Sequence, residues 1–160
     1  MIETKYPMTQ AIRVLKAGGA PFAIHAYAYE EHGGTAVAAR ELGVDEHRVV
    51  KTLVMETDAK APFIVIMCGD RDVSTKNMAR HLGVKAVAPC SPDAASKHTG
   101  YLVGGTSPFG TRKPLKIYVE RSIMDLPVIY INAGKRGLLA EMAPADMTRI
   151  LEPELVDVAV

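Results

Sequence analysis

Two β-branched, apolar runs separated by six residues constrain the fold of this chain more than any other feature. They cover Val49–Met55 and Pro62–Cys68, and the residues between them are mostly polar. Runs of this composition predict strands, and so short a connection predicts that the strands pair as an antiparallel hairpin. The chain is therefore expected to contain a sheet with at least one antiparallel pair.

Helical and strand patterns interleave on both sides of this hairpin. Helices are expected over Thr9–Ala17, Thr35–Leu42, Ser74–Leu82, from Ser91 onward and over Pro144–Leu151. The first four begin at a serine or threonine, which is expected to cap the helix. Further strands are expected over Phe22–Tyr29, Val84–Ala88, Ile117–Val119 and Val128–Asn132. No internal repeat or low-complexity tract divides the sequence. Residues 1–160 are therefore expected to form one domain of mixed α/β or α+β class.

Composition excludes several classes of protein. Hydrophobic residues make up 48% of the 160 residues, which argues against disorder. The longest apolar run, Pro62–Cys68, is far shorter than the roughly 20 residues of a membrane-spanning helix. Two cysteines, Cys68 and Cys90, are too few for a disulfide framework and fit a reducing cytoplasm.

The five histidines are scattered and the two cysteines lie far apart, so no zinc-ligand spacing is present. A structural zinc site is therefore not expected. A catalytic Cys–His pair assembled by the fold stays open, although no local signature supports it. Cys68 ends an apolar run and is interpreted as a thiol of the core or just below the surface.

Charge is distributed unevenly along the chain, although the net charge is only +1. Between Lys76 and Arg136 there are ten basic residues and three acidic ones, and the rest of the chain is correspondingly acidic. This pattern allows one face to meet phosphates, or it is simply ordinary solvated surface.

Lys51 interrupts the first apolar run and is followed by Thr52. A buried lysine is costly unless it has a partner. Either strand alternation sends Lys51 to solvent, or its ammonium faces a pocket and holds a phosphate, a carboxyl group or a developing oxyanion. The pattern alone leaves both possibilities open.

Two glycine-containing segments are further candidates for a binding site. The segment from Gly100 to Gly110 is expected to be a loop whose backbone N–H groups bind an anion, or merely a long connection. The segment Asn132–Gly137 is expected to be a tight basic turn at a strand end, where ligands often bind, although a solvated turn is commoner.

Three of these segments resemble one known family. Val50–Leu53 reads V-K-T-L, Ser96–Gly110 reads S-K-H-T-G-Y-L-V-G-G-T-S-P-F-G, and Asn132–Leu138 reads N-A-G-K-R-G-L. In this order and spacing they resemble the bacterial YbaK/EbsC family, which are free-standing relatives of the prolyl-tRNA synthetase editing domain. The resemblance covers essentially the whole chain.

The resemblance implies a fold, an activity and a site. The fold would be mixed α/β, with a central, mostly antiparallel, barrel-like sheet flanked by helices. The activity would be hydrolysis of the ester of a mischarged aminoacyl-tRNA, above all Cys-tRNA(Pro), with the substrate's own thiol as nucleophile and no cofactor or metal. The partners would be the acceptor end of aminoacyl-tRNA and a prolyl-tRNA synthetase. The protein would act in the cytoplasm and would not bind a membrane.

The resemblance also implies site residues. The implied catalytic residues are Lys51, Gly104 and Gly105, and the implied substrate-binding residues are Tyr27, Thr52, Ser107, Pro108, Lys135, Arg136 and Leu139.

One position departs from the family pattern. The better-known branch has an aspartate where this chain has Leu139, and Glu141 would replace it only if an extended segment puts both on one face. Loss of that carboxylate removes an anchor for the aminoacyl ammonium group. Three alternatives therefore stay open: a deacylase for another mischarged tRNA such as Ala-tRNA(Pro), a catalytically inactive module that binds tRNA or a synthetase, and a binder of a free nucleotide or amino acid.

Overall fold

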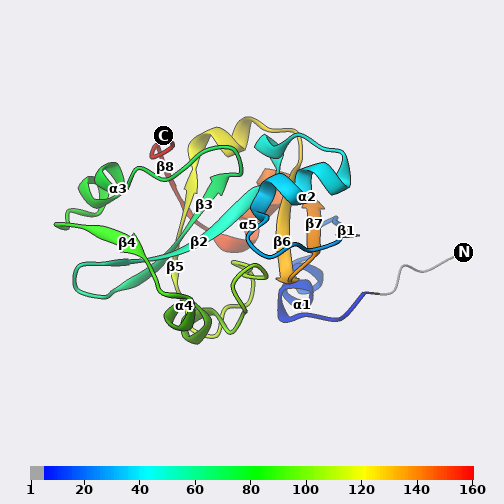
Figure 1. Ribbon diagram of the computed structural model, residues 1–160, viewed down its shortest axis with the longest axis horizontal. Helices are drawn as coiled ribbons and strands as arrows, with labels where there is room; N and C mark the ends of the chain where they lie inside the picture. Colours follow the sequence, from blue (N-terminus) through cyan, green and yellow to red (C-terminus); the bar gives the residue numbers. More distant parts are fainter. Residues whose placement is uncertain (1–5) are drawn as a thin grey trace, which may run out of the picture.

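The two apolar runs form a hairpin in the computed structural model, which describes residues 6–160 (Figure 1). Strands β2 (Val50–Thr57) and β3 (Pro62–Cys68) are antiparallel, with Val50 opposite Cys68. The turn between them is closed by a hydrogen bond from the Thr57 N–H to the Ala61 carbonyl. The predicted hairpin is confirmed.

This hairpin lies inside a five-stranded sheet of order β4-β2-β3-β5-β8. Strand β4 (Val87–Pro89) pairs antiparallel with the far end of β2, at Met55–Thr57. On the other side, β5 (Lys116–Glu120) runs parallel to β3, and β8 (Glu154–Val156) runs parallel to β5.

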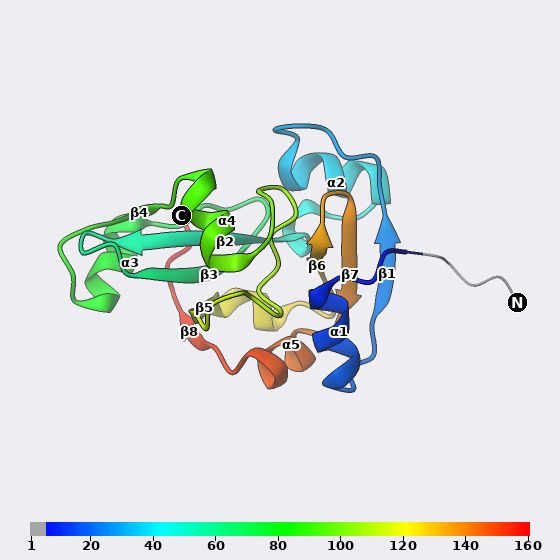
Figure 2. The same cartoon turned by 90° about the horizontal axis from the view of Figure 1, so that it is seen from below.

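A second, three-stranded sheet lies across the end of the first (Figure 2). It consists of β1 (Ala23–Ala26), β7 (Leu138–Met142) and β6 (Ile129–Lys135), paired antiparallel in that order. A single parallel bridge between Val49 and Tyr130 joins the two sheets. The mixed α/β class and the mostly antiparallel pairing are confirmed, but the strands form two joined sheets rather than a closed barrel.

Strand β3 is buried on both faces, and this explains its unbroken apolar sequence. Ile64, Ile66 and Cys68 belong to a core that spans both sheets, while alternate residues such as Val65 and Met67 belong to a second core on the opposite face. Each such side chain contributes roughly 1.5–3 kcal/mol by leaving water. A third, smaller cluster includes Ala38, Ala39, Val49, Tyr130 and Leu139.

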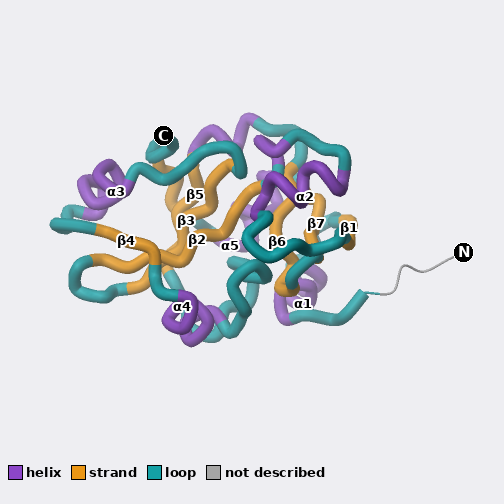
Figure 3. The backbone as a smooth tube through the Cα atoms, in the orientation of Figure 1, coloured by secondary structure: helices purple, strands orange, loops and turns teal. Residues whose placement is uncertain are grey.

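The helices lie around the two sheets (Figure 3) and contribute residues to these cores. Hydroxyl side chains begin three of the helices. Thr9, Ser74 and Ser91 each accept a hydrogen bond from a backbone N–H in the first helical turn, as predicted. The helices are α1 (Gln10–Ala17), α2 (Gly34–Leu42), α3 (Thr75–Leu82), α4 (Pro92–Thr99) and α5 (Pro144–Leu151), with short 3-10 helices η1 (Glu46–Arg48) and η2 (Arg121–Asp125). None of the helices in residues 6–160 has the length and hydropathy that a membrane crossing requires.

Thr35 is not the helix cap that the sequence predicts. The N-cap residue is Gly33, and helix α2 begins at Gly34, where the positive φ of 59° suits glycine. The Thr35 hydroxyl instead donates to Glu46 Oε2 (2.8 Å) and to the Gly69 carbonyl (3.1 Å). It therefore ties η1 to the turn that follows β3.

Several strand boundaries also differ from the prediction, because pairing partners decide where strands end. The first strand stops at Ala26, which pairs with Leu138, the first residue of β7. The short strand predicted over Val84–Ala88 lies later, at β4, opposite its partner on β2. Strand β6 continues through Gly134 to Lys135 across a register shift, so the turn begins later than predicted. The sequence did not predict strands β7 and β8.

A buried carboxylate fixes the C-terminal segment to the larger sheet. Glu120 is 4% exposed, and its two oxygens accept hydrogen bonds from the backbone N–H groups of Ser122, Val158 and Ala159 and from the Ser122 hydroxyl. Burial alone would raise the pKa of Glu120, but these four donors outweigh it and hold the pKa below its ordinary value.

We predict that Glu120→Gln lowers the free energy of unfolding at pH 7 by about 1–3 kcal/mol, because an amide replaces an acceptor that faces four donors. A carboxyl group with a lowered folded pKa stabilises the protein above its unfolded pKa of about 4.3, and this contribution is lost as the pH falls through the folded pKa. Urea unfolding at pH 7 and below pH 4 measures the difference, which should shrink in acid. A difference that is independent of pH would contradict this role.

Candidate functional site

A cavity of about 710 Å³ lies along the edge of β2 that β4 leaves uncovered. Strand β4 pairs only with Met55–Thr57, and Val50–Val54 line the cavity instead. Its other walls come from α2, from the segments at Tyr27–His32, Val103–Thr106 and Pro89–Ala95, and from Asn132, Arg136 and Leu139. Ligand cavities are commonly about 300–1,000 Å³, so this volume suits a small molecule or the end of a larger one.

The uncovered edge of β2 offers polar groups to this cavity. The Val54 carbonyl accepts a hydrogen bond from the Cys90 N–H across the edge, at 2.9 Å. Because backbone direction alternates along a strand, the N–H and C=O of Thr52 turn toward the same edge. The Thr52 hydroxyl oxygen is also buried, with no hydrogen-bond partner among the described residues. Thr52 can therefore bind a ligand through both backbone and side chain.

Lys51 reaches the same cavity from the opposite face of β2. It lies opposite Met67, whereas Thr52 lies opposite Ile66, so the cavity curves around the strand edge. The Lys51 side chain is 24% exposed, and its Nζ donates to Asp72 Oδ1 at 3.1 Å. The lysine is thus neither fully solvated nor isolated, and because Asp72 is 84% exposed, the ion pair is weak enough to exchange for a ligand.

The loop after α4 is fastened to the turn between β6 and β7. Asn132 Nδ2 donates to the Gly104 carbonyl (3.2 Å), and Arg136 Nε donates to the Val103 carbonyl (2.9 Å). The Arg136 guanidinium also lies over the Tyr29 ring, 5.3 Å from its centroid. These contacts fix the mouth of the cavity with residues from three separate parts of the sequence.

Two adjacent positions in this loop require glycine for different reasons. Gly104 has a φ of 92°, and a Cβ there would lie 2.5 Å from Tyr29 Oη. Gly105 has no such dihedral constraint, but its Cβ would lie 2.7 Å from the Arg136 backbone nitrogen. The pair of glycines therefore lets the loop pack directly against Tyr29 and the β6–β7 turn.

Six of the ten residues predicted for the site line the cavity: Tyr27, Lys51, Thr52, Gly104, Arg136 and Leu139. The other four lie outside the lining. Gly105 and Pro108 are buried, Lys135 is exposed, and Ser107 is fully buried with its Oγ accepting from the Phe109 N–H. Gly105 and Ser107 shape the loop here, and a substrate contact by any of the four stays a prediction.

Sequence reasoning missed other lining residues, among them Tyr29, Cys90, Val103, Thr106 and Asn132. Four of these residues lie close to positions that the sequence had already indicated. Tyr29 is two residues after Tyr27, Val103 and Thr106 lie in the loop from Gly100 to Gly110, and Asn132 lies in the basic turn. Cys90 had no signal in the sequence, because only the fold brings it opposite Val54.

Two potential nucleophiles in the cavity lining are not activated. Burial first, and the neighbouring Glu56 carboxylate second, raise the pKa of the Cys90 thiol to about 11, so it stays protonated. Burial likewise raises the pKa of the Tyr27 phenol. Neither group therefore offers an anionic nucleophile for ester cleavage at neutral pH.

Leu139 gives the cavity an aliphatic wall. It is 4% exposed and packs against Ala38, Val49 and Tyr130. Strand β7 is extended, so Glu141 does lie on the same face, but it contacts His25 Nε2 at 2.8 Å and does not line the cavity. Glu141 therefore does not supply a carboxylate in place of Leu139.

Comparison with known proteins identifies the sequence pattern. A family model described as the aminoacyl-tRNA editing domain matches residues 30–150. A provisionally named Cys-tRNA(Pro)/Cys-tRNA(Cys) deacylase, EbsC of Enterococcus faecalis, is 27% identical over 151 residues, which are 94% of this chain and 92% of that protein. A proline–tRNA ligase of Streptococcus equi subsp. zooepidemicus is 28% identical over 96 residues, which are 60% of this chain but 15% of the ligase.

Solved structures share the fold. A crystal structure described as a trans-editing enzyme for prolyl-tRNA synthetase has a TM-score of 0.84 and covers 97% of this chain and 99% of its own. The two sequences are 19% identical, so this likeness speaks for the fold alone.

We predict that Gly105→Ala lowers the free energy of unfolding by about 1–3 kcal/mol, because the added methyl group collides with rigid backbone. Gly18→Ala is the matched control, since its Cβ would meet mainly the flexible end of the Ile150 side chain. Urea unfolding of both variants compares the two costs. Equal costs would show that the loop is not held against the β6–β7 turn as described.

Proposed function

Because the chain belongs to the aminoacyl-tRNA editing domain family, we propose that it is a free-standing deacylase that hydrolyses the ester of a mischarged aminoacyl-tRNA. The observation that carries the proposal is the cavity at the open edge of β2, lined by Lys51, Thr52 and the Gly104 loop. In this proposal the whole chain, 1–160, acts as one editing domain.

The cavity suits the aminoacylated 3′ end of a tRNA. Its volume is large enough for an amino acid and part of the terminal adenosine. Lys51 and Arg136 supply positive charge at its lining, which favours the ribose–phosphate end of the substrate. The free backbone edge of Thr52 and its unpartnered hydroxyl would position the ester.

The chemistry that fits this lining uses a nucleophile from the substrate. The cysteine sulfur attacks the ester carbonyl carbon, and the bond from that carbon to the ribose oxygen breaks. The thiol proton passes to the leaving oxygen, which leaves intact tRNA and a cyclic thiolactone that water opens. Well-oriented intramolecular attack contributes about 7–11 kcal/mol, so positioning supplies much of the rate.

Lys51 is the residue to which we assign charge stabilisation in this step. Its ammonium would leave Asp72 and move to the phosphate or ribose beside the ester, where it lowers the cost of the developing negative charge. Gly104 and Gly105 bring the loop backbone close enough to orient the scissile carbonyl.

Leu139 bears on which amino acid is accepted. An aliphatic wall suits an uncharged side chain such as that of cysteine or alanine, and it gives the α-ammonium no buried carboxylate. The same feature keeps the second candidate function in view, which is a module that binds tRNA or a synthetase without cleaving the ester.

We further propose that tRNA identity comes from a prolyl-tRNA synthetase in the cytoplasm. The similarity to a segment of a proline–tRNA ligase supports this partner, because it places a related segment within the chain of such a ligase. Exposed basic residues near the loop, including Lys97, Arg112 and Lys113, suit phosphates of the acceptor stem.

We predict that Lys51→Ala slows deacylation by about 10²–10³-fold, the cost of removing one stabilising donor from a charged transition state. Lys16→Ala is the control, because Lys16 is exposed on α1 and does not line the cavity. Single-turnover release of amino acid from charged tRNA measures both, with circular dichroism to verify folding. Unchanged release by a folded Lys51→Ala variant would remove the lysine from the mechanism.

We predict that the protein releases cysteine from Cys-tRNA(Pro) and leaves Ser-tRNA(Pro) and Pro-tRNA(Pro) intact. Serine matches cysteine in shape but carries a hydroxyl that is a far weaker nucleophile. Release of alanine from Ala-tRNA(Pro) would instead show that water is the nucleophile. No release from any of the four, with tRNA binding retained, would favour the binding module.

A further inference from the structure

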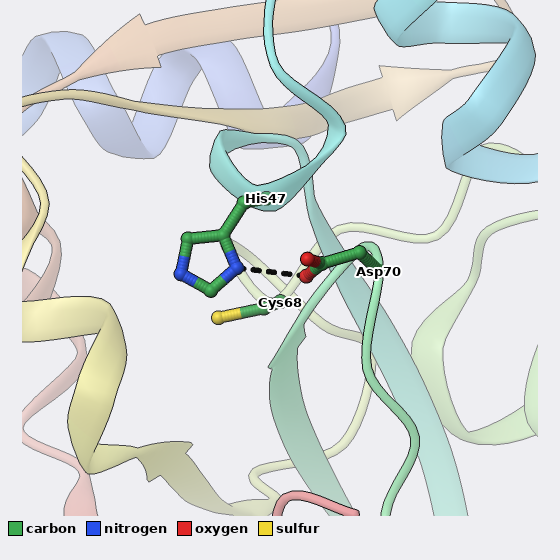
Figure 4. Close-up of side chains that lie close together, drawn as sticks. All are labelled: His47, Cys68 and Asp70. Atoms are coloured by element: carbon green, nitrogen blue, oxygen red, sulfur yellow. Dashed lines mark hydrogen bonds and ion pairs between the residues drawn. The ribbon is translucent and has the colours of Figure 1, made fainter.

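Three potential metal ligands converge beside the turn that follows β3 (Figure 4). His47 comes from η1, Cys68 ends β3, and Asp70 lies in the turn. One ligand atom from each side chain lies within 4.8 Å of the other two, and His47 Nδ1 is 2.8 Å from Asp70 Oδ1. This cluster takes no part in the function proposed above.

The backbone around the cluster is fixed independently of the three side chains. Gly69 packs so closely that a Cβ there would lie 2.4 Å from the Val49 carbonyl and 2.7 Å from the Glu46 carbonyl. The Thr35 hydroxyl bonds both the Gly69 carbonyl and Glu46 Oε2, and thereby joins η1 to the turn. The convergence of the cluster therefore follows from packed backbone rather than from chance rotamers.

The exposure of each side chain in the cluster limits the chemistry that the cluster can perform. Cys68 is fully buried, so its sulfur cannot attack an ester carried by a macromolecule, and a Cys–His–Asp nucleophilic site is excluded. The His47 and Asp70 side chains are 35% and 42% exposed, so two of the three ligands can meet a cation from solvent.

We propose that His47, Cys68 and Asp70 bind one Zn²⁺ ion. An imidazole, a thiolate and a carboxylate form a donor set that suits this borderline-soft cation, and three protein ligands leave one position for water. Bond lengths of about 2.0–2.3 Å place tetrahedral ligand atoms about 3.5 Å apart. His47 Nδ1 and Asp70 Oδ1, which are 2.8 Å apart, would therefore separate on binding, and the ligand atoms that lie as far as 4.8 Å apart would approach one another. On binding, the Cys68 thiol releases its proton to solvent and Asp70 exchanges its hydrogen bond to His47 for the metal.

Ser122 lies beside the Cys68 sulfur. Its hydroxyl oxygen is 4.0 Å from Cys68 Sγ, and its hydrogen is donated to Glu120 Oε2. It therefore accepts from the Cys68 thiol in the metal-free protein and can turn to donate to the sulfur only if it leaves Glu120. The bound ion would also fix the turn that leads to Asp72, the partner of Lys51, so the site lies one turn from the cavity.

The spacing of His47 and Cys68, 21 residues apart, is not that of a structural zinc motif, which is why the sequence predicted no such site. The sequence left open a catalytic Cys–His pair. The fold brings His47 beside Cys68, but burial of the sulfur excludes that catalytic role, and Asp70 completes a set of three potential metal ligands.

Titration of the reduced, chelator-treated full chain with Co²⁺ tests the proposal. We expect one Co²⁺ per chain, a near-ultraviolet thiolate-to-cobalt charge-transfer band, and displacement of that band by Zn²⁺. Cys68→Ser should abolish the band, whereas the matched control Cys90→Ser should keep it, because Cys90 lies outside the cluster.

If the Cys68→Ser variant does not fold, variants of the two half-exposed ligands still test the proposal. His47→Gln and Asp70→Asn should each weaken Zn²⁺ binding by at least about 10–100-fold, the cost of losing even an outer partner. Absence of a thiolate band in the wild type, or unchanged affinity in both variants, would overturn the proposal. The readout is metal binding alone, so it stands apart from any result on deacylation.

Discussion

Burial of β3 on both faces is the constraint on which the rest of this structure depends. The strand packs against one core that spans both sheets and against a second core on the opposite face. The register of β3 against β2 and β5 is therefore fixed by packing as well as by hydrogen bonds. A slip of one residue would move each β3 side chain from its own core into the opposite one. The elements that carry the candidate site are positioned relative to this strand.

The candidate site exists because β2 is paired along only part of one edge. Strand β4 covers Met55–Thr57, and the preceding residues keep a free edge that faces the cavity. A free strand edge is normally a liability. Here α2 and the Gly104 loop enclose it, so backbone groups that would otherwise promote aggregation become available to a ligand.

The turn after β3 connects the two sites discussed above. Within five residues it carries Cys68 and Asp70 of the proposed zinc site and Asp72, the partner of Lys51. Gly69 makes this arrangement possible because no side chain fits between the turn and η1. Changes at the metal cluster and changes at the lysine are therefore expected to be mechanically coupled through a short, tightly packed segment.

The sequence by itself determined the hairpin, the serine and threonine caps of three helices, and the segments that carry Lys51, Gly104 and Arg136. These follow from local periodicity, capping chemistry and short motifs, which act over a few residues. Only the tertiary structure decided that the strands form two sheets, that Cys90 and Tyr29 line the cavity, that Ser107 and Gly105 lie outside its lining, and that His47 meets Cys68 and Asp70. The physical reason is that these outcomes depend on contacts between residues far apart in the chain, which register and packing fix and which no local pattern records.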